Sequence, residues 1–148
     1  MTSNQHATWV LITDSNDCRI YQYIKKPHQL TLIKEINHPE NKLRDIDLTS
    51  DKPGHYGTSG SARGAYSQPT DPKEIKIEDF SRNIAKELDH DRNINAYEKL
   101  IVIAPPHMNG LLIKHINKHV KELITHNIEK DLLHLNEHEL LEFLHTHT

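Results

Sequence analysis

The chain lacks the features that would assign it to several large classes of protein. It has one cysteine, Cys18, among 148 residues, so no internal disulfide can form, as is typical of a reducing compartment. No apolar run approaches the roughly 20 residues that a transmembrane helix requires. The first six residues place no basic region ahead of an apolar stretch, so no signal peptide is apparent. We therefore expect a cytoplasmic protein without a membrane span.

An excess of charge of one sign is also missing. The 18 basic and 21 acidic residues give a formal net charge of −3, so no global positive field exists to attract nucleic acid. Neither a phosphate-binding P-loop nor a strand-linked GxGxxG motif occurs, and Gly57-Thr-Ser-Gly60 is too short a pattern to indicate a nucleotide. We therefore expect no cofactor and identify no small-molecule ligand.

Glycine is scarce, and four of the five glycines lie in one serine-containing segment at about 44–70. The segment is predicted to form one long loop, and loops above about 15 residues are usually either functional or disordered. Two interpretations stay open. The loop is a solvated insertion that cannot bury enough surface to become ordered, or it is an arm that becomes ordered on a large partner. In both cases we expect residues 52–68 to have the least protected backbone of the free protein.

The second interpretation assigns a role to particular side chains of this loop. Cations are available for phosphates and aromatic rings for stacking, whereas three aspartates, Asp45, Asp47 and Asp51, dilute the positive charge. The candidate binding residues are Arg44, Lys52, Tyr56, Gly60, Arg63, Gly64, Tyr66 and Gln68.

The rest of the chain predicts a single α/β domain spanning residues 1–148. Apolar patterns predict strands at 8–13, 18–24, 30–36, 99–104 and 120–128, with helix as the alternative for 120–125. Capping signals predict helices that begin at Asp71-Pro72, after Pro105-Pro106 and at Asn136. The resulting β-β-β-α-β-α-β-α order, with a five-stranded mixed sheet, is that of the ribonuclease H-like fold.

The same patterns predict which side chains are buried. Cys18 and the aromatic residues Trp9, Tyr21 and Tyr23 are interpreted as sheet core, and the terminal residues 145–148 as frayed and solvated. The expected core comprises Val10, Ile12, Ile20, Ile33, Phe80, Ile84, Leu88, Ile101, Ile103, Leu112 and Ile116.

A complete catalytic or metal-binding set is not apparent, so the assignment leans away from an enzyme. A metal-dependent nuclease needs converging carboxylates, but Asp14 is better explained as a turn residue, and the strand ending at Ala104 is followed by prolines. His115 and His119, four residues apart on an expected helix, are weak candidates for a metal. Partly buried, hydrogen-bonded histidines that face the domain are the favoured interpretation of this pair.

Several segments, taken in order over nearly the whole chain, resemble the bacterial host-attachment protein family. The strand followed by Ala-Pro-Pro and the Glu-Lys-Asp-Leu segment are the most specific of them. The segments are Trp9-Val-Leu-Ile-Thr-Asp14, Thr70-Asp-Pro-Lys-Glu74, Phe80 with Ala85 and Leu88, Leu100-Ile-Val-Ile-Ala-Pro-Pro106 with Gly110-Leu111, and Glu129-Lys-Asp-Leu-Leu-His-Leu135.

The resemblance implies a relation to the class-1 eukaryotic and archaeal release factors, whose middle domain is ribonuclease H-like. Their loop ending in Gly-Gly-Gln reaches the peptidyl-transferase centre, whereas this chain has Gly64-Ala-Tyr-Ser-Gln68, so peptidyl-tRNA hydrolysis is not implied. RNA or ribosome binding through the long loop is implied. The alternative is an attachment or surface-interaction protein without catalytic chemistry. The sequence also permits a homo-oligomer.

Overall fold

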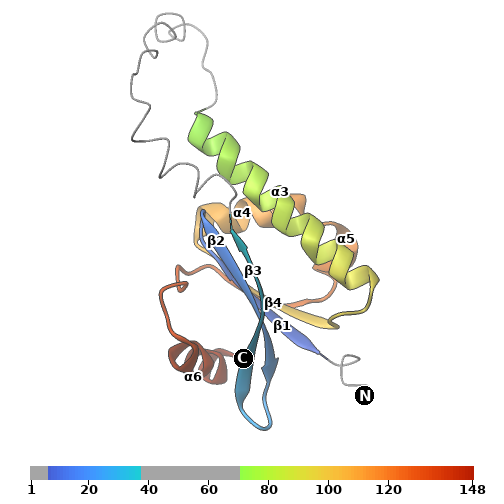
Figure 1. Ribbon diagram of the computed structural model, residues 1–148, viewed down its shortest axis with the longest axis vertical. Coiled ribbons are helices and arrows are strands. Elements are labelled where there is room, and N and C mark those ends of the chain that lie inside the picture. The colour runs from blue at the N-terminus through green and yellow to red at the C-terminus, as the bar shows by residue number, and fades with distance from the viewer. Residues whose placement is uncertain (1–6, 38–70) are drawn as a thin grey trace, which may run out of the picture.

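The computed structural model describes residues 7–37 and 71–148 (Figure 1). The candidate binding residues of the long loop, from Arg44 to Gln68, lie outside the described residues. Residues 52–68, whose backbone is expected to be weakly protected, also lie outside them.

The described chain forms one five-stranded mixed sheet with helices on both faces, which confirms the predicted α/β class. The sheet order is β3-β2-β1-β4-β5. Strand β1 pairs antiparallel with β2 and parallel with β4, and β4 pairs parallel with β5. The strands are β1 (Thr8–Thr13), β2 (Asp17–Ile24), β3 (Gln29–Asn37), β4 (Lys99–Ile103) and β5 (Ile124–Ile128).

Local signals in the sequence account for the helix starts. Asp71 caps α3 by accepting a hydrogen bond from the Lys73 backbone N–H, and Asn136 and Glu139 form a reciprocal capping box at α6. Both starts were predicted from the sequence and are confirmed. The helices are α3 (Pro72–Asn93), α4 (Pro106–His115), α5 (Lys118–Lys121) and α6 (Glu137–His147).

The sheet separates two apolar clusters because successive strand residues point to opposite faces. Trp9 and Leu11 of β1 belong to the cluster under α3, α4 and α5, whereas Val10 and Ile12 belong to the cluster under α6. The helices lie on opposite sides of the sheet accordingly (Figure 1). All of the expected core residues except Ile33 are buried.

Ile33 was predicted to be buried, and this is wrong: its side chain is 40% exposed. The register between β2 and β3 shifts at Ile20 and Tyr21, which pair with Lys34 and Leu32 respectively. Ile33 is therefore the extra residue of a β-bulge. Apolar and polar residues continue to alternate in the sequence through the bulge. The side chains, however, no longer alternate regularly between the two faces of the sheet there.

The predicted strand at 120–128 begins too early. Val120 lies in the short helix α5, and only Ile124–Ile128 form β5. Asn117 starts α5 by accepting a hydrogen bond from the Val120 backbone N–H over 2.9 Å. The helical alternative is therefore right for Val120 and wrong for the strand residues Ile124 and Thr125.

Residues 145–147 are exposed and Thr148 is half-buried, but the prediction that these terminal residues are frayed is wrong. Helix α6 extends through His147, whose ring stacks on Phe143 with centroids 4.0 Å apart. The His145 ring packs edge-on against His28 at 4.8 Å. These ring contacts favour a helix in residues 145–147, where the sequence is rich in threonine and histidine and gave little indication of a helix.

Candidate functional site

Three parallel strands end at the same edge of the sheet, which we call the carboxyl edge. It is defined by Thr13 of β1, Ile103 of β4 and Ile128 of β5, the last residues of these strands. In open α/β sheets, ligands bind beyond the carboxyl ends of the strands. This edge is therefore the first place to look for a functional site.

Both described neighbours of residues 38–70 lie at the carboxyl edge. Asn37 ends β3 there, because it pairs with Asp17 beside the end of β1. On the other side, Glu74 in the first turn of α3 lies 3.0 Å from Nε2 of His107, in the first turn after β4. The described residues that precede and follow 38–70 thus lie at the carboxyl edge.

An amide pair joins buried Asn109 of α4 to exposed Asn127 of β5 near the carboxyl edge. Asn109, 3% exposed, donates from Nδ2 to Asn127 Oδ1 over 3.1 Å and to Glu129 Oε2 over 3.0 Å. Asn127 donates from Nδ2 to Asn109 Oδ1 over 2.7 Å and to the Val102 carbonyl over 3.3 Å. The buried Asn109 amide is therefore satisfied, as buried polar groups require. Sequence reasoning missed this pair, because nothing local marks a contact between positions 18 residues apart.

The carboxylates near this edge have separate partners. Asp14 Oδ1 accepts from the backbone N–H groups of Asn16 and Asp17 at 2.8 and 2.9 Å, which confirms the predicted turn. Burial and the neighbouring Asp14 raise the pKa of Asp17. Within residues 7–37 and 71–148, no group of three or more histidine, cysteine, aspartate or glutamate side chains could hold a metal ion.

The weak metal candidates His115 and His119 do not share a helix face. Helix α4 ends at His115, and Ile116 is extended, with φ −69° and ψ 134°, before α5 begins. His119 is therefore exposed, so the prediction that both histidines face the domain is wrong for it. His115 is largely buried, and its Nε2 lies 2.8 Å from Glu78 Oε2. It links α4 to α3, as the hydrogen-bonded interpretation expected.

Glu78 is the centre of a cross-helix cluster of charges. Besides His115, its Oε2 lies 2.9 Å from Lys114 Nζ and 3.7 Å from Arg82. Hydrogen bonds from Lys114 and His115, with the Arg82 charge, lower the pKa of Glu78 to about 2. This carboxylate stays ionised at neutral pH and partly offsets the charge of Lys114.

Cys18 and four of the described aromatic side chains belong to the core. Cys18 is fully buried, and burial raises the pKa of its thiol to about 12, so almost no nucleophilic thiolate exists at neutral pH. Trp9 stacks on Tyr97 with centroids 4.8 Å apart, and both Tyr21 and Tyr23 are buried. The prediction that Cys18, Trp9, Tyr21 and Tyr23 belong to the core is confirmed.

Among residues 7–37 and 71–148, no helix combines the length and the apolar character needed to cross a membrane.

Comparison with solved structures gives distant likenesses. An archaeal translation termination factor aligns with 86% of this chain and 31% of its own, at 12% identity and a TM-score of 0.48. A translation termination-like factor of S. cerevisiae involved in RNA quality control pathways covers 95% of this chain and 33% of its own, at 10% identity and a TM-score of 0.47. A ParM mutant aligns at 14% identity and a TM-score of 0.44. This chain spans about a third of the length of the two factors, and likenesses at this level carry no functional argument.

Comparison of sequences is more informative. An uncharacterized protein of Rickettsia prowazekii (strain Madrid E) is 27% identical over 136 residues, which cover 86% of this chain and 85% of that protein. The family described as "Protein required for attachment to host cells" matches residues 9–144, and the chain therefore belongs to this family.

Proposed function

We propose that this protein is a cytoplasmic, non-catalytic binding factor that associates with RNA or the ribosome through residues 44–70. Arg44, Lys52 and Arg63 would contact phosphates, and Tyr56 and Tyr66 would stack on unpaired bases. Gly60, Gly64 and Gln68 complete the proposed binding residues.

One observation carries this proposal: the two described neighbours of the segment, Asn37 and Asp71, are attached at the carboxyl edge. Open α/β sheets bind their ligands at this edge. The segment adds three cations and two aromatic rings, the side chains that recognise single-stranded RNA. The carboxylates of Asp14, Glu74 and Glu129 are engaged with other groups. Binding is thus better supported than hydrolysis.

We also propose that the domain is ribonuclease H-like. The strand order β3-β2-β1-β4-β5 supports this, with an antiparallel start and two parallel strands added on the other side of β1. The two crossovers into β4 and β5 each contain helix, as parallel connections require.

The first prediction tests the binding residues. Replacing Arg44, Lys52 and Arg63 by alanine should weaken association with ribosomes or single-stranded RNA. The slope of affinity against salt should flatten by up to about three phosphate contacts, because fewer counterions are released. Stability should change by no more than about 0.5 kcal/mol. Co-sedimentation with ribosomes and RNA titrations at several salt concentrations measure both effects.

A matched variant changes the same number of charges elsewhere. Lys86, Lys121 and Lys130 replaced by alanine should leave binding and its salt slope nearly unchanged. Failure of the wild-type protein to bind ribosomes or RNA at low salt would refute the proposal. Binding lost only when Lys114 and Lys118 are replaced would keep the partner and move the site to α4 and α5.

The second candidate is an attachment or surface-interaction protein without catalytic chemistry, and the description of the family favours it. If this second candidate is correct, the protein lies at the cell surface and has no affinity for RNA. Surface labelling of intact cells, run beside ribosome sedimentation of the lysate, separates the two. Labelling from outside together with absence from ribosomal fractions would support the second candidate.

A further inference from the structure

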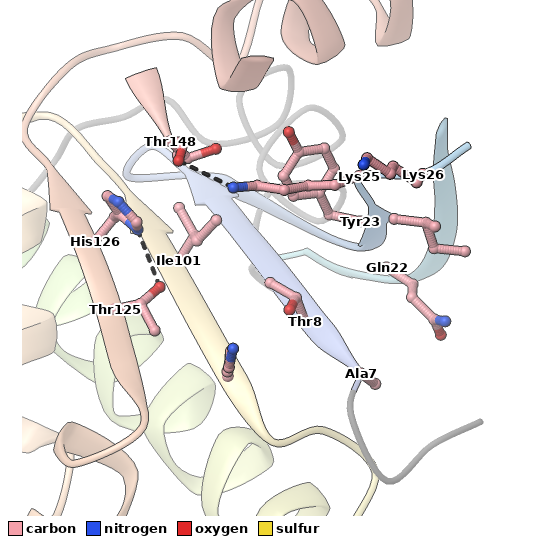
Figure 2. A pocket seen from close by; sticks show the side chains of 12 residues that line it. Ala7, Thr8, Gln22, Tyr23, Lys25, Lys26, Ile101, Thr125, His126 and Thr148 are labelled. Atoms are coloured by element: carbon pink, nitrogen blue, oxygen red, sulfur yellow. Dashed lines mark hydrogen bonds between the residues drawn. The ribbon is translucent and has the colours of Figure 1, made fainter. Parts of the chain in front are cut away.

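A cavity of about 520 Å³ opens on the face of the sheet that carries α6, at the strand ends opposite the carboxyl edge. Its floor follows two rows of the sheet. Thr8 is paired with Tyr23 on one side and Lys99 on the other, and Ile101 is paired with His126. Thr148, which follows α6, lies beside these rows and also lines the cavity (Figure 2). The volume is within the range of small-molecule sites.

The lining of the cavity is one-sided in charge. It includes three lysines, Lys25, Lys26 and Lys99, and the imidazole of His126, and its other side chains are neutral. In residues 7–37 and 71–148, no acidic side chain forms an ion pair with Lys26 or Lys99. Cations gathered in a concave site raise the local concentration of anions.

The end of α6 brings one negative group, and a lysine faces it. Lys25 Nζ donates to the Thr148 main-chain oxygen over 3.1 Å, and Figure 2 shows this side chain lying across the cavity mouth. The carbonyl end of a helix carries a partial negative charge, which this contact offsets. Lys26, Lys99 and His126 therefore remain to attract a ligand.

Apolar groups lie beside the cations. Ile101 and Tyr23 form part of the floor, and Ala7 and Ile24 contribute to the walls. Thr8 and Thr125 add hydroxyl groups, and Thr125 Oγ1 lies 3.0 Å from Nδ1 of His126. Such a site suits a ligand with an anionic head and a partly apolar body.

We propose that this cavity binds a small organic phosphate monoester. Lys26, Lys99 and His126 supply the positive charge that attracts the phosphate, and the apolar part lies over Ile101 and Tyr23. The site is separate from the carboxyl edge and does not depend on RNA binding by residues 44–70.

Hexyl phosphate is a direct probe, titrated into the full-length isotope-labelled protein and followed by amide chemical shifts. Saturable shifts are expected around Thr8, Lys99 and His126, with an affinity about tenfold or more above that of inorganic phosphate, because the alkyl chain buries apolar surface. Dimethyl phosphate, which carries one charge fewer and represents an RNA backbone, should bind at least about threefold more weakly than hexyl phosphate. Hexanol should bind far more weakly than hexyl phosphate, since it has no anionic head.

Paired variants test the lysines. Replacing Lys26 and Lys99 by methionine should weaken hexyl phosphate at least about tenfold. The same replacement of Lys118 and Lys121, exposed on α5, changes the net charge equally and should leave the affinity within about twofold. Circular dichroism of each variant verifies folding, and Thr8→Trp, which fills the floor, should block binding without a change of charge.

The proposal would be overturned by the absence of saturable hexyl phosphate binding to the wild-type protein, by equal weakening in the two lysine variants, or by shifts that map away from the cavity. Hexanol binding as tightly as hexyl phosphate would also overturn it, because the anion would then be irrelevant.

Discussion

Lys34 illustrates how one residue depends on a local irregularity of the chain. The β-bulge at Ile33 lets Lys34 pair with Ile20, whose side chain faces α3. There Lys34 Nζ lies 2.6 Å from Asp91 Oδ2 and 3.0 Å from Glu87 Oε1. The side chain of Asp91 is only 8% exposed, so Lys34 is the cation that balances a buried carboxylate.

Removing this cation should be costly. Lys34→Met leaves Asp91 buried without its partner, and the free energy of unfolding should fall by about 3 kcal/mol. Glu87→Gln removes the more exposed partner and should cost within about 0.5 kcal/mol. Urea unfolding at neutral pH measures both. Similar effects of the two replacements would show that Asp91 does not depend on Lys34.

Glu78 should make the free energy of unfolding depend on pH in the acid range. Its pKa is about 2 in the folded protein against an ordinary value of 4.5, so its contribution is fully present above 4.5 and is lost as the pH falls through about 2. Glu78→Gln should therefore flatten the decline of the free energy of unfolding between pH 5 and 2. Glu122→Gln on the surface is the control. A decline as steep in Glu78→Gln as in wild type would contradict the assigned contacts.

At the scale of elements, strand β4 is, with β1, one of the two most completely buried strands of the sheet. Four of its five residues are buried, and Ile103 is fully so. Ile103→Asp would put an unpaired charge between two neighbouring strands and should abolish soluble folding. Ile75→Asp introduces the same charge on an exposed first turn of α3 and should be tolerated. Soluble expression and circular dichroism distinguish the two, and a folded Ile103→Asp protein would refute the placement of this strand.

Elements with a local signal could be predicted from the sequence, and those decided by distant contacts could not. The starts of α3 and α6 are visible because a capping side chain and its backbone partner lie within three residues. The bulge at Ile33 and the break after His115 depend on how neighbouring elements pack. Sequence periodicity alone therefore misplaced Ile33 and His119.

The same limit applies to the candidate site. The contact between Glu78 and His115 and the amide pair of Asn109 and Asn127 join residues 37 and 18 positions apart. The cavity near Thr8 draws on β1, β2, β4 and β5 and on the end of α6, so no single stretch of sequence marks it. The candidate binding residues at 44–70 were recognised by composition alone, and they stay a prediction.

At the scale of the whole molecule, binding and folding should be separable. Two apolar clusters, one on each face of the sheet, are built from residues on both sides of the 38–70 segment. Replacing residues 44–68 by a glycine-serine sequence of equal length keeps the loop-closure entropy similar, so stability should change by no more than about 1 kcal/mol. RNA or ribosome association should disappear. Urea unfolding and co-sedimentation measure the two, and a large loss of stability would show that the segment supports the fold.

The bulge in β3 also affects the expected tendency of the protein to aggregate at high concentration. Strand β3 is one of the two edge strands of the sheet, and it exposes Leu32 and Ile33. An edge strand with exposed apolar side chains favours pairing with the edge of another sheet. The extra residue interrupts the regular ladder beside these apolar side chains, and the charged Lys34 and Glu35 follow at once. We therefore expect the irregularity that removed Ile33 from the core to reduce edge-to-edge aggregation.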